Sequence, residues 1–244
     1  MKLESTALIL DFDPFSSRIE AESTHNLGER IDLADGRTFR YAKIGASNAV
    51  KGQLQLAPVP KTNHHNNTIA VAATTGSTQI SVTLGATAAD ANEYSEGYMV
   101  VNDVDGEGQT YKIKSHPAHA GSGTLVVTLF DPISVALTTN SQVSLVHNKY
   151  NGVIVGTVVT QRAAGVPLIS VLAGDYCWLQ TRGTAGVLIG TAATLGADLI
   201  VGGTNGSVTD RTDALGASSE PVVAVADIAV GVATEYNPVT LKID

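Results

Sequence analysis

Four of the histidines occur in two close pairs that could bind a transition metal, because imidazole is a common ligand for such ions. His64 and His65 are adjacent, and two residues separate His116 from His119. Neither pair is accompanied by a cysteine pair or by acidic residues at ligand spacing. Both pairs lie in polar segments, so the sequence favours exposed loop histidines, with a metal shared between subunits as the alternative. We predict no metal site.

A short acidic segment resembles part of a calcium-binding loop, since closely spaced carboxylates around a turn glycine can surround a hard cation. The segment contains Asp103, Asp105 and Gly106. With Gly106 placed at the invariant glycine of such a loop, Val101 falls at the first ligand position and Lys112 at the position of the bidentate glutamate. The sequence therefore predicts a hairpin turn here rather than a calcium site.

Candidate nucleophiles and phosphate loops lack the residues that would activate them. Cys177 lies inside an apolar, strand-like segment with no supporting motif, and we expect a small buried side chain there. The glycine-rich run 202–206 lacks the Lys-Ser/Thr ending of a phosphate loop, and no serine lies in a Gly-x-Ser-x-Gly elbow. Carboxylate pairs that cleave glycosides are joined only in space, so an enzyme remains an alternative. We predict no catalytic residue, no cofactor and no enzymatic activity.

Charge and composition favour a protein that binds other protein surfaces. The formal net charge is −8, and only 16% of the 244 residues are charged. Nucleic-acid affinity depends on clustered basic residues, so nucleic acid is not expected as a direct partner. A thinly charged surface rich in Thr, Val and Ala is easier to understand if copies or partners cover much of it. We therefore expect a homo-oligomer.

The sequence also indicates where the protein is made. A single cysteine, Cys177, excludes an intramolecular disulfide, and the first thirty residues lack the pattern of a secretory signal. The apolar segment 221–233 is too short to cross a bilayer and is interrupted by Asp227. We expect synthesis in a reducing cytoplasm and no membrane partner.

The elements that must position these residues are predicted to be strands. From Thr68 onward the apolar residues alternate with a period close to two, and helical periodicity is almost absent. The predicted fold class is all-β, with one or two small sandwich or barrel modules and an extended N-terminal arm. The predicted divisions are an arm with a short hairpin over 1–60, a first β domain over 61–148 and a second over 149–244.

Within this outline, Asp35-Gly36 marks a tight hairpin between 30–33 and 38–41. Residues 45–56 could form a short helix, and 58–67 form a linker. Three further hairpins or strand pairs are expected at 69–84, 98–113 and 125–147. The later strands are expected at 153–159, 168–172, 176–181, 187–189, 197–201, 222–226 and 239–243. Trp178 is expected to be buried in the core of the second domain.

The order of several segments resembles the virion structural proteins of tailed bacteriophages, in particular the capsid decoration or cement proteins. The segments that carry the likeness are Asp-Gly-Arg-Thr-Phe-Arg-Tyr-Ala, Val-His-Asn-Lys-Tyr-Asn-Gly-Val-Ile-Val, Tyr-Cys-Trp-Leu-Gln-Thr-Arg-Gly and Thr-Glu-Tyr-Asn-Pro-Val-Thr-Leu-Lys-Ile-Asp. They span residues 35–244 and contain hydrophobic and turn patterns rather than a catalytic signature. No functional residue is carried over from the family.

This resemblance implies a protein of the capsid surface that binds the major capsid protein, commonly as a trimer, and stabilises the shell against the pressure of packaged DNA. An N-terminal arm could add strands to exposed edges of a neighbour. A fibre, tail or host-binding component of the virion is the alternative, because β-rich adhesive modules share this composition. A polysaccharide-degrading virion enzyme is the third hypothesis.

Overall fold

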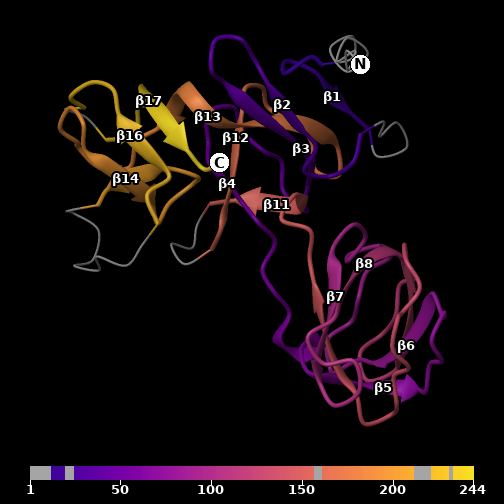
Figure 1. Cartoon of the computed structure of the whole chain (residues 1–244). Helices are drawn as coiled ribbons and strands as arrows, with labels where there is room; N and C mark the ends of the chain where they lie inside the picture. Colours follow the sequence, from indigo (N-terminus) through magenta and orange to yellow (C-terminus); the bar gives the residue numbers. More distant parts are fainter. Residues whose placement is uncertain (1–11, 20–24, 157–160, 212–220, 231–232) are drawn as a thin grey trace. The chain divides into compact units, whose positions relative to one another are not determined.

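The computed structural model describes residues 12–19, 25–156, 161–211, 221–230 and 233–244. Within these residues, helix is confined to the short 3-10 helix η2 (Thr62–His64), and no helix is long and apolar enough to cross a membrane. The strands form an 11-stranded sheet and a closed six-stranded barrel (Figure 1). The predicted all-β fold class is confirmed, with two β modules.

The chain divides into two compact units, one of which is inserted into the other. The barrel module is Pro58–Asn151, and the large module combines Met1–Ala57 with Gly152–Asp244. The barrel strands are β5 (Asn67–Val71), β6 (Gln79–Thr83), β7 (Tyr98–Asp103), β8 (Thr110–Ser115), β9 (Thr124–Leu129) and β10 (Gln142–Val146). They close in the order β10-β5-β6-β9-β8-β7 with antiparallel neighbours, so the barrel leaves no open edge.

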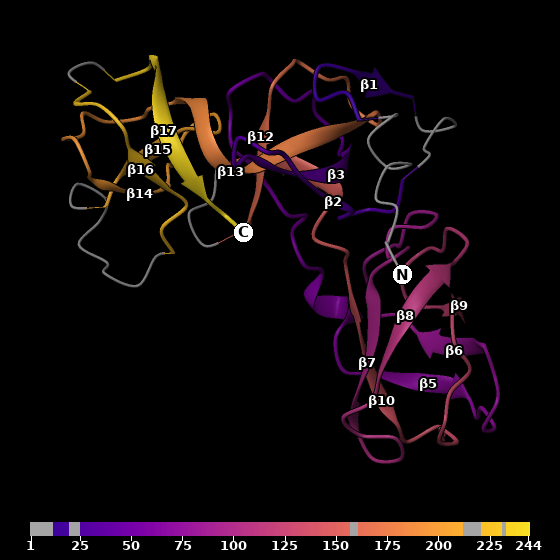
Figure 2. The same cartoon turned by 45° about the horizontal axis from the view of Figure 1, so that its top comes forward.

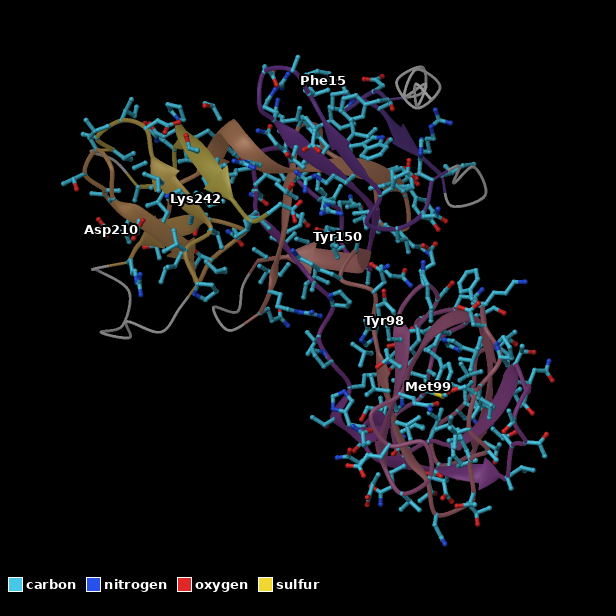
Figure 3. The ribbon with its side chains drawn as sticks, viewed as in Figure 1. Phe15, Tyr98, Met99, Tyr150, Asp210 and Lys242 are labelled. Atoms are coloured by element: carbon cyan, nitrogen blue, oxygen red, sulfur yellow. The ribbon has the colours of Figure 1, made fainter. Side chains whose placement is uncertain are left out.

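Alternating side chains fill the barrel, as the period of two in the sequence predicts. In β7, Met99 is fully buried while the preceding Tyr98 is 45% exposed; both are labelled in Figure 3. The same alternation buries Ile80 and Val82 in β6. The resulting core lies wholly within residues 69–145, so the barrel module has a hydrophobic core of its own.

The barrel module extends slightly beyond the predicted domain of residues 61–148, and side chains at its end explain why. Asn151 donates hydrogen bonds from Nδ2 to the backbone oxygens of Asn92 and Glu93, at 3.2 and 3.1 Å. Tyr150 is buried. Residues 150 and 151 are therefore part of the barrel module, which ends at Asn151.

Because its core and its hydrogen-bonded edges are closed within one segment, the fragment 58–151 is expected to fold alone. The measurement is a dispersed amide NMR spectrum with slow hydrogen exchange at the buried strand residues Val82, Met99 and Leu145. A fragment ending at 148, which lacks Tyr150 and Asn151, should be less stable. A collapsed spectrum for 58–151, with the full chain folded, would contradict an independent barrel.

The large module is built on the 11-stranded sheet, in the order β15-β14-β16-β17-β13-β12-β4-β11-β3-β2, with β1 paired to β13 (Figure 2). Its first strands are β1 (Ser17–Arg18), β2 (Arg30–Asp32), β3 (Thr38–Ile44) and β4 (Gln55–Leu56). The later strands are β11 (Asn151–Val155), β12 (Ala163–Pro167), β13 (Tyr176–Leu188), β14 (Asp198–Val201), β15 (Val208–Asp210), β16 (Ala224–Ala226) and β17 (Tyr236–Lys242).

The long strand β13 holds this sheet together. Its residues 176–182 pair with β3, and its residues 182–188 pair with β17. Gly183 lies where the partner changes, with φ at +83°, a left-handed conformation that glycine adopts without strain. The sequence predicts two separate strands here, 176–181 and 187–189, whereas the glycine lies inside one continuous strand.

The predicted N-terminal arm is corrected by the pairing of β3. Six residue pairs join β3 to β13, and β2 pairs with β3 through the predicted hairpin at Asp35-Gly36. The described residues of 25–57 therefore form part of the large module rather than an arm that reaches a neighbour. Residues 1–11 and 20–24, which also belong to the predicted arm, lie outside the described residues.

Aromatic side chains from both segments of the large module form one of its cores. Trp178 is 3% exposed, as the sequence predicts, and packs with Phe39 and Tyr41. The Phe12 ring lies 5.2 Å from the Trp178 ring and 5.1 Å from the Phe39 ring, both edge to face. Of the three phenylalanines in the N-terminal part of the chain, Phe12 and Phe39 therefore pack in this core, while Phe15 is exposed.

Other local predictions differ from the structure at points where tertiary contacts override sequence pattern. Residues 45–56 form turns and the short strand β4 instead of a helix. The predicted linker 58–67 contains η2 and the start of β5, with a buried His64. The strand expected at 168–172 is β12, five residues earlier. The strand expected at 153–159 is β11, which ends at Val155, and residues 157–159 lie outside the described residues. The hairpins β5–β6 and β7–β8 are confirmed.

Candidate functional site

The predicted loop histidines form a buried polar cluster around Tyr94 in the barrel module. His64 and His116 are almost fully buried, so the prediction that they are exposed is wrong. The Tyr94 ring lies 5.7 Å from the His64 ring, 5.6 Å from the His116 ring and 4.5 Å from the ring of His147, measured between centroids. Burial, followed by the nearby charge of Glu93, raises the pKa of Tyr94 far above its usual value, so its hydroxyl keeps its proton.

Hydrogen bonds occupy both ring nitrogens of His64 and of His116. The backbone oxygen of Thr87 lies 2.8 Å from His64 Nε2, which must donate to it, and the Tyr94 hydroxyl lies 2.5 Å from His64 Nδ1. His116 Nε2 accepts the Tyr94 backbone N–H at 2.9 Å, and its Nδ1 donates to Pro117. Burial lowers the pKa of His116, which fits this neutral form.

Glu93 joins the same cluster to the surface. Its carboxylate accepts hydrogen bonds from His147 Nε2 at 3.0 Å and from Lys61 Nζ at 2.7 Å. Burial alone would raise the pKa of Glu93, but the hydrogen bonds from His147 and Lys61 outweigh it and lower that pKa to about 2. The Glu93 carboxylate is therefore ionised at neutral pH and holds the side chains of His147 and Lys61 in place.

This cluster is organised for structure rather than for metal binding. Among the residues that the structure describes, no three His, Cys, Asp or Glu side chains are placed to hold a metal ion. The ring nitrogens of His64 and His116 already serve Thr87, Tyr94 and Pro117, so neither ring has a free lone pair to offer. The sequence missed the cluster because its members come from separate loops.

The other sequence candidates also have structural roles. The acidic segment forms the predicted turn between β7 and β8, where Asp105 Oδ2 accepts a hydrogen bond from Thr138. Cys177 is buried as predicted, and burial raises the pKa of its thiol to about 12, which keeps it protonated and unreactive at neutral pH. Neither candidate forms a catalytic site.

An aromatic stripe, defined as Tyr98, Lys112 and Phe130, crosses the outer wall of the barrel. Tyr98 in β7 is paired with Lys112 in β8, and the Lys112 ammonium lies 5.3 Å from the centre of the Phe130 ring. Tyr98 and Phe130 are each about half exposed. Exposed aromatic rings beside a cation are typical of surfaces that bind other molecules, because the rings lose little conformational entropy on binding.

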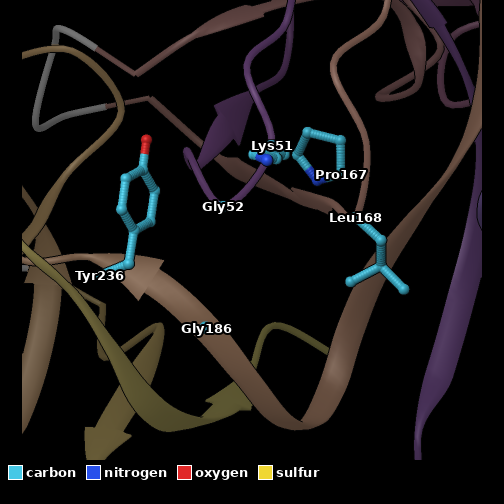
Figure 4. A pocket seen from close by; sticks show the side chains of 6 residues that line it. All are labelled: Lys51, Gly52, Pro167, Leu168, Gly186 and Tyr236. Atoms are coloured by element: carbon cyan, nitrogen blue, oxygen red, sulfur yellow. The ribbon is translucent and has the colours of Figure 1, made fainter.

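The large module carries a pocket of about 290 Å³ whose lining is mostly apolar (Figure 4). Its lining residues are Lys51, Gly52, Pro167, Leu168, Gly186 and Tyr236. Gly52 has φ at +73°, and a Cβ there would lie 2.7 Å from the Tyr236 ring, so glycine allows the ring to lie against the loop. Sequence reasoning missed the pocket, since four separate segments contribute to it and none has a motif.

Exposed apolar side chains also lie in the segments of the chain that line this pocket. Leu172 is 64% exposed, and Val50 and Tyr236 are also exposed. An antiparallel bridge between Ala49 and Val171 places the Val50 and Leu172 segments side by side. The pocket is therefore part of a larger apolar surface, the kind of surface that marks a binding site for another molecule.

Comparisons with family models, with curated proteins and with solved structures found no match to this chain.

Proposed function

We propose that this chain is a decoration (cement) protein of a tailed-bacteriophage head, which binds the major capsid protein on the outer surface of the shell and stabilises it. The proposal begins with the resemblance of segments across residues 35–244 to such virion proteins. The observation that carries it is the exposure of large apolar side chains on both modules, including Tyr98 and Phe130 on the barrel and Leu172 and Tyr236 on the large module. We propose a homotrimer as the assembled form.

The buried polar groups favour binding over chemistry as the function. The tyrosine and histidines of the barrel cluster bond one another, the backbone or Glu93, and Cys177 is buried and protonated. An active site needs groups that can reach a substrate, whereas these groups support the fold. The exposed apolar surfaces are the features that remain open to a partner.

The test is to mix the purified protein with undecorated shells of the phage that encodes it and to measure occupancy by cryo-electron microscopy. We expect compact oligomers bound to the shell. The double variant Tyr98→Thr and Phe130→Thr is expected to lower affinity about tenfold, because aromatic anchors contribute most to protein interfaces. The matched control Lys114→Thr removes an exposed side chain of the same strand as Lys112 and should leave affinity unchanged.

Salt provides the second readout of the same experiment. Exposed ion pairs are screened within about 10 Å at 0.1 M salt, whereas apolar contacts persist, so occupancy should change less than about twofold between 0.1 and 1 M salt. Release at high salt with the oligomer intact would show that charge holds the interface. Elongated particles that ignore shells would favour a fibre, tail or host-binding component, and cleavage of glycans would favour an enzyme.

A further inference from the structure

The pocket of the large module combines an apolar interior with one positive charge. Pro167, Leu168 and Tyr236 line it together with Lys51, whose side chain is exposed (Figure 4). Of the described residues that line the pocket, Lys51 alone is charged. Among the residues that the structure describes, no carboxylate lies within ion-pair distance of its ammonium group.

The volume of this pocket indicates the size of its occupant. About 290 Å³ is just below the range for ligand pockets, roughly 300–1,000 Å³, and suits one large side chain better than a nucleotide-sized cofactor. Protein interfaces commonly use such pockets to bury an anchor side chain of the partner. The exposed Val50 and Leu172 nearby would cover the backbone on either side of that anchor.

The charge of Lys51 indicates the chemistry of the same occupant. An unpaired ammonium at the rim of an apolar pocket favours a carboxylate placed next to an apolar group. The chain carries 23 Asp and Glu against 15 Lys and Arg, so an uncompensated lysine at a pocket differs from the acidic background.

We propose that this pocket binds an apolar anchor side chain of a partner protein, aromatic or long aliphatic, that lies beside an Asp or Glu. The identification of that partner as the shell subunit rests on the function proposed above. Lys51 pairs with the carboxylate, and the open space above Gly186 takes the anchor side chain.

The first experiment uses 3-phenylpropionate, which joins a phenyl ring to a carboxylate, as a probe titrated into ¹⁵N-labelled full-length protein. We expect shifts of the Gly52, Leu168 and Gly186 amides, with weaker binding of the uncharged analogue 3-phenylpropanol. Lys51→Met should weaken binding of the carboxylate about three- to fivefold, the size of one exposed ion pair, and leave the alcohol unaffected. Lys242→Met is the matched control, since Lys242 is exposed at the opposite end of β17 from Tyr236.

A blocking variant tests the interior of the pocket. A Cβ on Gly186 would meet no atom within 4 Å, so Gly186→Leu should fold normally, fill the space and abolish probe binding. Equal binding of 3-phenylpropionate and 3-phenylpropanol would overturn the acidic part of the proposal. The absence of shifts at the pocket amides with either probe would overturn the proposal as a whole.

The second experiment separates this inference from the proposed function. If the unmodified protein binds undecorated shells and Gly186→Leu does not, the pocket is the attachment site. If both bind equally, the pocket is not used for attachment, while the decoration function stands. If the unmodified protein does not bind shells, the shell subunit is excluded as partner, and the probe titration alone decides whether the pocket takes an apolar, acidic group.

Discussion

Replacing Trp178 by alanine is expected to destabilise the large module by about 3–5 kcal/mol, the usual cost of deleting a buried tryptophan side chain. The ring lies within a group of aromatic side chains and is in edge or tilted contact with Phe12, His25 and Tyr41, at centroid distances of 5.1–5.2 Å. Its removal would leave a cavity between strands that come from distant parts of the chain. Urea unfolding followed by far-ultraviolet circular dichroism measures the loss.

The control for this prediction is Phe15→Ala in the same module. Phe15 is 64% exposed, so its removal should change stability by no more than about 0.5 kcal/mol. In the unmodified protein, iodide should barely quench the fluorescence of Trp178. Ready quenching, or a loss below about 1 kcal/mol in Trp178→Ala, would show that the ring is not buried in solution.

Acidification is expected to unfold the barrel module before the large module. The pKa of Glu93 is lowered from 4.5 to about 2 in the folded state, so its contribution is full above pH 4.5 and is lost as pH falls toward 2. The pKa of buried His116 is lowered from 6.5, so its contribution is likewise present above pH 6.5 and is lost below it. Both groups act in the same direction, and together they weaken the barrel over the acid range.

For Glu93 alone, acidification is expected to lower the free energy of unfolding of the barrel by about 2 kcal/mol, after allowing for the partial contact of the carboxylate with solvent. Hydrogen exchange of barrel amides, measured from pH 7 to pH 3 and corrected for intrinsic rates, reports it separately from the large module. Glu93→Gln keeps the size of the side chain and removes the charge, so this variant should be less stable at pH 7 and less sensitive to acid. An equal pH dependence in the variant and the unmodified protein would exclude Glu93 as the cause.

The parts of the fold that the sequence predicts are those whose signals are local. Asp35-Gly36 favours a tight turn through its backbone conformation, and the hairpin around it is present. The alternation in 79–84 and 98–113 likewise gives the predicted barrel strands. In these cases the residues that pair lie close together in the chain.

The parts that the sequence did not predict depend on distant pairing. Residues 38–44 become a central strand because 176–182 lie beside them, and no local pattern identifies that partner. His64 follows two prolines in a polar run, which is typical of an exposed loop, yet Tyr94 and Thr87 bury it. The pocket also depends on distant pairing, because two of its lining residues, Lys51 and Tyr236, lie far apart in the sequence.

The insertion of the barrel module between β4 and β11 also sets the order in which the protein can form during synthesis. After Ile44 leaves the ribosome, its neighbours in β3 wait on the order of 10 s for Tyr176 and the rest of β13, at ordinary rates of translation. The barrel, complete at Asn151, can close in that interval. Newly made chains therefore carry a finished barrel while Phe39 and Tyr41 still lack Trp178. Their side chains stay uncovered in this intermediate, which makes it the stage most prone to aggregation.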